Sequence, residues 1–163
     1  MKEIKLSKKG KYKGIYVAQV DDEDFRYLNQ FNYSIAIGKS VMYARRRIIK
    51  NGKPTLISMH NDIMGRAGVD HKDHNGLNNQ KYNLRFCTSQ ENNMNAKPNR
   101  NAVSKYKGVG WHKLVGKWYA SIQKDFKLIT IGWFENEVDA AKAYDLKAKE
   151  LFGEFAYLNF DPE

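Results

Sequence analysis

Residues 69–88, with the sequence VDHKDHNGLNNQKYNLRFCT, gather short polar side chains that could bind a metal ion and activate water. The stretch holds two histidines, two aspartates and four asparagines. A carboxylate and an amide oxygen are hard ligands that suit Mg²⁺ or Mn²⁺. A neutral imidazole is the usual base for deprotonating water near pH 7, and an amide oxygen can fix its tautomer. The residue types therefore predict a metal-dependent site with room for water and a phosphate.

A β-hairpin followed by a helix is the simplest local fold that would assemble this site. AGVDH and NLRFCT are the expected strands, and Thr88 with Glu91 three residues later is typical of a helix start. Asp70 and His71 are adjacent, and in a regular strand they would face opposite sides. We therefore expect a strand end or a bulge at this pair. The four side chains that this fold would bring within reach of one another are Asp70, His71, Asn83 and Asn92.

The stretch VDHKDHNGLNNQKYNLRFCTSQEN resembles the HNH nuclease motif, in the Asp-His/Asn/Asn form of phage and intron-encoded homing or nicking endonucleases with a ββα-metal fold. Residues 20–65 are similar to the segment that precedes the motif in many phage proteins of this kind. The resemblance implies that Asp70 and Asn92 bind one divalent cation, Mg²⁺ or Mn²⁺. It makes His71 the general base and Asn83 its orienting partner. His74 stands where a glycine is more usual, and an asparagine replaces the third histidine of the motif.

Other interpretations of these histidines stay open at this point. Asp70-His71 in isolation would be an ordinary loop dipeptide. His60 is expected to be a structural residue under the site, and His74 a solvated loop residue. A zinc site formed by His60, His71, His74 and Cys87 lacks the paired-cysteine spacing that would support it.

A second candidate surface precedes the motif. MYARRRIIK and KPTLISMH are strand-like runs on either side of Asn51-Gly52, the pair that a two-residue type I′ hairpin prefers. We expect DNA contacts from Arg45, Arg46 and Arg47, and from Arg85 in NLRF; alternation would send Arg45 and Arg47 to one face. A solvated edge is the alternative for the arginine run.

The last third of the sequence predicts three short strands, KYKGVGWHK, KWYASIQ and LITIGWF, followed by a helix. The helix is expected to begin after Asn136 and to end at Gly153. Its core positions are predicted to include Val138, Ala141, Ala148 and Leu151. We also expect Trp118, Trp133 and Tyr144 between sheet and helix, and Trp111 to be exposed.

This segment, from its Tyr-x-Gly-Val to its Leu-Asn-Phe, is similar to the plant Apetala-two/ethylene-response-factor DNA-binding domain. The resemblance implies a three-stranded sheet that lies in the DNA major groove. Residues 104–127 agree with this, because they hold six lysines against Asp125 alone, whereas 128–163 are acidic. The expected DNA contacts are Lys107, Trp111, His112, Lys113, Lys117 and Lys124. Lysines contact phosphates more readily than they read guanine, so modest base specificity is expected.

Composition limits the class of protein. The chain has 163 residues, a net charge of +10 and a pI near 9.6, so a polyanion is the natural partner. Cys87 is the single cysteine, which favours a reducing compartment. No stretch reaches the ~18 apolar residues of a membrane helix, and the N-terminus lacks a secretory signal. We expect a soluble monomer in the cytoplasm of a bacterial host, encoded by a phage or mobile element.

The sequence thus predicts an α+β protein with four parts. These are a strand-rich nuclease region at 1–60, a ββα-metal motif at 61–95, a linker at 96–103 and a DNA-binding domain at 104–160. The predicted function is a metal-dependent endonuclease of the homing type that hydrolyses phosphodiester bonds in double-stranded DNA, by nicking or double-strand cutting. The alternative is a non-catalytic, sequence-specific DNA-binding regulator derived from a nuclease.

Overall fold

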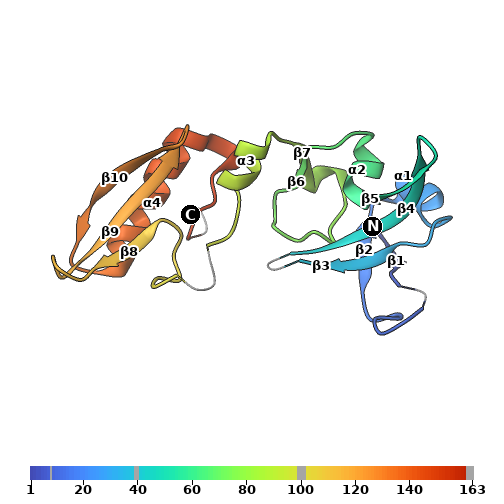
Figure 1. Cartoon of the computed structure of the whole chain (residues 1–163), viewed down its shortest axis with the longest axis horizontal. Helices are drawn as coiled ribbons and strands as arrows, with labels where there is room; N and C mark the ends of the chain where they lie inside the picture. The colour runs from blue at the N-terminus through green and yellow to red at the C-terminus, as the bar shows by residue number, and fades with distance from the viewer. Residues whose placement is uncertain (8, 39–40, 99–101, 161–163) are drawn as a thin grey trace. The chain divides into compact units, whose positions relative to one another are not determined.

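The computed structural model describes residues 1–7, 9–38, 41–98 and 102–160, which form a mixed α+β protein. The chain divides into two compact units, Met1–Ser89 and Gln90–Glu163 (Figure 1). The predicted linker at 96–103 therefore falls inside the second unit, and its residues 99–101 lie outside the described part. None of the helices in the described residues is long and apolar enough to cross a membrane.

Two antiparallel sheets and two short helices make the body of the first unit. The smaller sheet pairs β1 (Lys2–Lys5) with β2 (Val17–Val20), and the larger has the order β3 (Ser34–Ile37), β4 (Met42–Lys50), β5 (Lys53–Ser58). The helices are α1 (Asp22–Leu28) and α2 (Met59–Met64). Eight residues, contributed by both sheets, both helices and the adjoining loops, form the core: Ile4, Leu6, Ala18, Val20, Leu28, Tyr33, Ala44 and Met59.

The turn between β4 and β5 follows the sequence prediction. Lys50 pairs with Lys53, which leaves Asn51 and Gly52 as a two-residue loop with φ values of 50° and 72°. A type I′ turn needs positive φ at both central residues, and asparagine and glycine tolerate it best. The turn fixes the register of β4, so Arg45 and Arg47 lie exposed on one face, as alternation predicts, while Arg46 faces the interior.

The predicted hairpin and helix around the site are present. β6 (Val69–His71) pairs antiparallel with β7 (Leu84–Phe86), with Asp70 opposite Arg85. A 3₁₀ turn, Lys81–Asn83, leads into β7. The helix α3 (Ser89–Met94) begins directly after Thr88. Because β6 ends at His71, the expected strand end is found at the Asp70-His71 pair.

The second unit is a three-stranded antiparallel sheet with a long helix packed on one face (Figure 1). The sheet order is β10 (Lys127–Phe134), β9 (Lys117–Lys124), β8 (Val109–His112), and the helix α4 (Glu137–Phe152) is followed by a 3₁₀ turn at Gly153–Phe155. The Asn136 side chain accepts a hydrogen bond of 2.8 Å from the Asp139 backbone N–H, which confirms it as the N-cap of α4. Gly153 ends the helix as predicted.

Two core predictions for this unit are wrong. Val138 is 41% exposed, and the buried stripe of α4 consists instead of Ala140, Ala141, Tyr144 and Ala148. Trp133 is 47% exposed and pairs with Tyr119 on the face of the sheet away from the helix. The cause is a bulge between Thr130 and Gly132, which adds one residue to β10 and reverses the alternation beyond it.

Candidate functional site

The end of β6 places two buried ionisable side chains next to each other. Asp70 is 8% exposed and His71 is 4% exposed. The guanidinium of Arg85 donates to Asp70 Oδ2 from Nε at 3.2 Å and from Nη2 at 3.0 Å. Arg85, predicted to contact DNA, therefore forms a buried ion pair with the predicted metal ligand across β6 and β7. A carboxylate oxygen is also a hard ligand of the kind that divalent cations such as Mg²⁺ prefer.

The asparagine-rich loop between β6 and β7 is held by its own polar side chains. Asp73 Oδ1 accepts from the Asn75 backbone N–H at 2.8 Å, and Asp73 Oδ2 accepts from Asn78 Nδ2 at 2.8 Å. Asn83 Nδ2 donates to Asp73 Oδ1 at 2.9 Å and to the carbonyl oxygen of Asn78 at 2.8 Å. His74 has a φ of 59°, the left-handed region that favours glycine. Its backbone explains why a glycine would suit this position.

Asn79, rather than the predicted Asn83, provides the amide beside the histidine ring. His71 Nε2 lies 3.3 Å from Asn79 Oδ1, whereas both ends of the Asn83 amide bind the loop. The position of Asn79 is fixed from outside the loop, because its backbone N–H donates to the Gln19 carbonyl on β2 at 2.8 Å. The backbone N–H of Gln19 in turn donates to the carbonyl oxygen of Leu77 at 2.8 Å. The sequence pattern could not reveal this anchor, which joins segments about sixty residues apart.

Three aromatic rings meet at the site. The ring centroids of His60 and His71 lie 4.8 Å apart and perpendicular, at 89°. Tyr43 lies 5.6 Å from His60 and 5.9 Å from His71. On the same face of β4 as Tyr43, the guanidinium of Arg45 lies 5.9 Å from the Tyr43 ring. His60 is thus a buried structural neighbour of the site, as the sequence predicts.

Both histidines are held in their neutral form. Burial lowers the pKa of His71 from its ordinary value, although the Asn79 contact and the carboxylates Asp73 and Asp70 oppose the shift. Burial, with the charges of His71 and Arg45, lowers the pKa of His60 to about 3. A neutral imidazole can accept a proton, so His71 has the protonation state that a general base requires near pH 7.

The zinc alternative finds no support in the structure. Within the described residues, which include all four candidate ligands, no group of three or more His, Cys, Asp and Glu side chains could hold a metal ion. Of the two predicted magnesium ligands, Asp70 and Asn92, the one in the first unit is Asp70. Asn92 lies exposed on α3, in the second unit, and its role as a ligand stays a prediction.

Arg46 has a structural role in place of the predicted DNA contact. Its Nε donates to Asp62 Oδ2 at 2.6 Å and its Nη2 to Asp62 Oδ1 at 3.0 Å. The guanidinium also stacks 3.8 Å from the centroid of the Phe31 ring. The same carboxylate accepts a hydrogen bond of 2.5 Å from the hydroxyl of Tyr33. Arg45 and Arg47 are both exposed, and their contact with DNA stays a prediction.

The predicted DNA contacts of the second unit are distributed over different surfaces. Lys107 is partly buried, and its ammonium donates to the carbonyl oxygens of Asn93 and Met94 on α3 and of Ala96 just after it, at 3.3, 2.5 and 2.7 Å. Its charge is thus used inside the unit, which replaces its predicted DNA contact. Strand alternation separates the others. Trp111 and Lys124 lie on the helix side of the sheet, and Trp111 is 38% exposed, so its expected exposure is confirmed.

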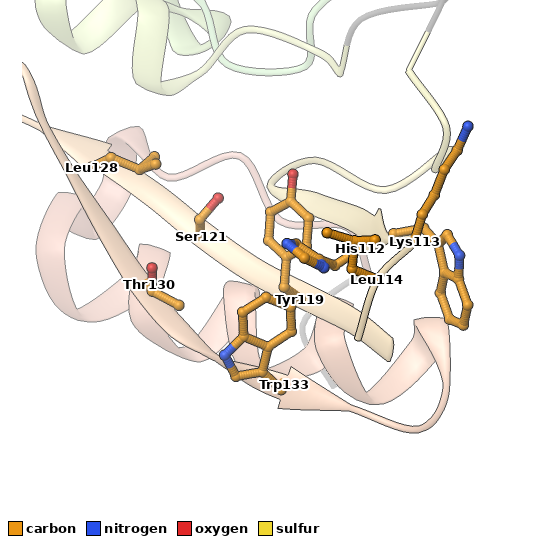
Figure 2. Close-up of a pocket in the computed structure, with 9 residues that line it drawn as sticks. His112, Lys113, Leu114, Tyr119, Ser121, Leu128, Thr130 and Trp133 are labelled. Atoms are coloured by element: carbon orange, nitrogen blue, oxygen red, sulfur yellow. The ribbon is translucent and has the colours of Figure 1, made fainter. Parts of the chain in front are cut away.

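The opposite face of this sheet carries two of the predicted DNA contacts, His112 and Lys117, beside side chains that the sequence analysis did not select as DNA contacts. The pairing of the strands places His112, Lys117, Tyr119, Ser121, Gln123, Leu128, Thr130 and Trp133 on this outer face. Figure 2 shows Tyr119 and Ser121 pointing to the same side of β9, with Trp133 and Thr130 on the neighbouring strand. A hollow of about 480 Å³ is lined by six of these residues, by Trp111 at the end of β8 and by the turn residues Lys113 and Leu114. We call this surface the outer sheet face.

Comparison with known proteins finds relatives for most of the chain and, separately, for a stretch of 61 residues. No family model matches it. It is 37% identical over 134 residues, 82% of its length, to a protein of Acanthamoeba polyphaga mimivirus named as an uncharacterized HNH endonuclease. The match spans 65% of the viral protein. Over 61 residues the chain is 43% identical to an ethylene-responsive transcription factor of Arabidopsis thaliana and to an APETALA2-like protein of Oryza sativa subsp. japonica, and the match spans 14% of each. The chain is therefore similar over most of its length to a viral HNH endonuclease and over about a third to plant APETALA2-type proteins.

Proposed function

We propose that this protein is a metal-dependent DNA endonuclease that hydrolyses phosphodiester bonds with His71 as the general base. The observation that carries the proposal is the buried Asp70-His71 pair at the end of β6, with the His71 ring beside Asn79. The similarity to a viral HNH endonuclease gives independent support. The fold alone is compatible with many other functions, so the proposal depends on these side chains.

The donor set suits one hard divalent cation. Asp70 would hold the ion through its carboxylate, and Asn92 would add an amide oxygen, in agreement with the resemblance. So few protein ligands leave coordination positions for water and a phosphate, which is how Mg²⁺ is usually bound. When bound, such an ion neutralises charge on the scissile phosphate and on the departing oxygen. We propose that Arg85, which lies beside Asp70, would also contact that phosphate through its guanidinium.

The His71 ring has a defined task in this scheme. With Nε2–H donating to Asn79 Oδ1, the lone pair lies on Nδ1, which accepts the proton of the attacking water. Burial keeps the ring neutral before the reaction. Asn79 then stabilises the imidazolium that forms, since its amide oxygen faces the protonated nitrogen. Asn79 is therefore a positioning residue, in the place expected for Asn83.

The arginines of β4 and the second unit would hold the DNA. Arg45 and Arg47 are exposed on the face of β4 that also carries Tyr43, which touches the His71 ring. Phosphate contacts position a nuclease on DNA without reading its sequence. The second unit would add binding to the duplex, as the similarity to plant transcription factors suggests. We propose that one chain acts alone, so its single site would nick one strand at a time.

A supercoiled-plasmid assay tests the proposal. Wild type, His71→Ala and His74→Asn are compared with Mg²⁺, Mn²⁺ or EDTA, and binding of the same DNA is measured in EDTA. General-base catalysis contributes roughly 10²–10⁴-fold, so His71→Ala should lose cleavage by about that factor while it binds DNA normally. His74→Asn is the matched control, because asparagine tolerates the left-handed backbone of that loop position and should cleave normally.

The alternative function is a non-catalytic DNA-binding regulator. It would be favoured if wild type bound DNA yet left plasmid, phage and host genomic DNA intact with every metal. The form of the product separates the finer possibilities, since relaxed circles indicate nicking and linear molecules indicate double-strand cutting. Equal loss of binding and cleavage in His71→Ala would make His71 a structural residue and would contradict the proposed mechanism.

A further inference from the structure

The outer sheet face of the second unit has an unusual composition for a surface that meets DNA. Residues 101–163 contain no arginine at all. Lys117 is the single lysine on the strands of this face, and its ammonium forms an ion pair of 2.7 Å with Glu135. Bidentate contacts from arginine or lysine are the commonest way in which proteins read guanine in the major groove. Among the usual readers of G·C pairs, the strands of this face therefore offer no arginine and one lysine, which is already paired with Glu135.

The side chains that this face does carry fit A·T pairs. Thymine presents a methyl group in the major groove, which proteins recognise by apolar contact, and adenine presents a donor and an acceptor that glutamine can bind together. Leu128 is 71% exposed and pairs directly with the exposed Gln123 across β9 and β10. Thr130, one step along the same face, adds a second methyl group beside Ser121. The Leu128 side chain and the Gln123 amide thus lie side by side on neighbouring strands.

The charges around the face agree with a DNA partner. The segment 104–127, which contains β8 and β9, holds six lysines and one acidic residue, although the charge of Lys107 is bound inside the unit and Lys124 lies on the helix side. The helix α4, on the other side of the sheet, carries four acidic residues. Lys113 and Lys127 lie in or beside the two turns that border the face. Such lysines bind phosphates as point charges and carry no base preference. In this scheme the lysines bind the DNA phosphates, and other residues of the face contact the bases.

We infer that the outer sheet face recognises A·T base pairs in the DNA major groove, with Gln123 binding adenine and with Leu128 and Thr130 contacting thymine methyl groups. The inference rests on the DNA binding proposed above and adds the base preference. Tyr119 and Trp133 line the other end of the face and pack on each other, with ring centroids 5.7 Å apart. Both rings lie on the same side of the sheet as Gln123, Leu128 and Thr130.

The first experiment selects bound duplexes from a randomised pool, with the full chain kept in EDTA so that no metal-dependent cleavage occurs. We expect a selected site rich in A·T pairs. The thymines of that site are then replaced by deoxyuridine, which removes the methyl group and keeps every hydrogen-bonding group. A buried methyl or methylene group contributes about 0.8 kcal/mol, so each contacted methyl lost should weaken binding roughly fourfold.

Variants identify the residues responsible. Leu128→Ala should bind the thymine and deoxyuridine duplexes with nearly equal affinity, because the contact to the methyl group is already lost. Leu146→Ala is the matched control, since Leu146 is also a leucine and is 74% exposed, but lies on α4. It should keep the full thymine preference. Gln123→Ala should lose roughly tenfold for the selected site, within the range for one bidentate base contact.

Three results would overturn the inference. These are a G·C-rich selected site, equal affinity of wild type for thymine and deoxyuridine duplexes, and no enrichment of any duplex, which would point to a protein partner for the face. Failure of the nuclease proposal looks different. A chain that selects A·T sites without cleaving DNA would contradict the nuclease and leave this inference standing. A chain that cleaves every duplex equally well would support the nuclease and contradict the A·T preference.

Discussion

Acidification should destabilise the first unit through His60. The unfolded chain binds a proton on this histidine below its ordinary pKa of about 6.5. The folded unit does not bind it until about pH 3, because the ring is buried against Tyr43 and His71. Between these two values the unfolded state holds more protons, so the free energy of unfolding falls as the pH falls. The contribution of His60 is fully present above pH 6.5 and is progressively lost from there towards pH 3.

The magnitude follows from the two pKa values. At pH 5 the unfolded histidine is about 1.5 pH units below its pKa, which corresponds to a loss of about 2 kcal/mol relative to neutral pH. For a unit of this size, 1 kcal/mol shifts the melting temperature by roughly 4–8 °C. His60→Phe keeps a ring against Tyr43 and His71 but cannot titrate. The variant should therefore lose about 2 kcal/mol less than wild type between pH 7 and pH 5.

Thermal melts at both pH values test this prediction. Far-ultraviolet circular dichroism reports on both units, whereas tryptophan fluorescence reports on the second unit, since all three tryptophans, Trp111, Trp118 and Trp133, lie there. The difference between the two signals isolates the first unit. If wild type and His60→Phe lost the same stability on acidification, the buried neutral state of His60 would be refuted as the cause.

Two further changes test the packing of each unit. Asp62→Asn leaves the charge of Arg46 buried without its carboxylate partner, and we expect the first unit to lose about 3–5 kcal/mol in urea denaturation; a loss below 1 kcal/mol would mean that Arg46 escapes to water. Phe126 has a φ of 62° beside Asp125 in the turn between β9 and β10, and it is 97% exposed. Phe126→Gly should stabilise the second unit by about 1 kcal/mol, because glycine adopts this backbone without strain, whereas Phe126→Ala should show no such gain.

The sequence by itself determined the features that depend on neighbours along the chain. Asn51-Gly52 specified a tight turn, and with it the register that exposes Arg45 and Arg47. Asn136 and Gly153 specified the ends of α4. Asp70-His71 required a strand end, and β6 ends there. Each of these depends on backbone preferences or on hydrogen bonds within a few residues, which a single sequence displays directly.

Other features were decided by contacts between distant segments. Asn79 faces the His71 ring because β2 holds the loop, so the choice between Asn79 and Asn83 depends on Gln19. The ammonium of Lys107 is bound inside the unit because α3 and the residues just after it offer three carbonyl oxygens. Nothing within a few residues of these positions encodes the partner, so no periodicity could have predicted it.

The outer sheet face shows the same division within one strand. Residues 127–130 alternate as the pattern predicts, and Thr130 points outward. One extra residue before Gly132 then reverses the alternation and turns Trp133 from the expected core to the surface. The sequence determined that a strand would form, because its residues favour one. The tertiary structure decided which side chains face outward, because the bulge exists only in the pairing of β10 with β9.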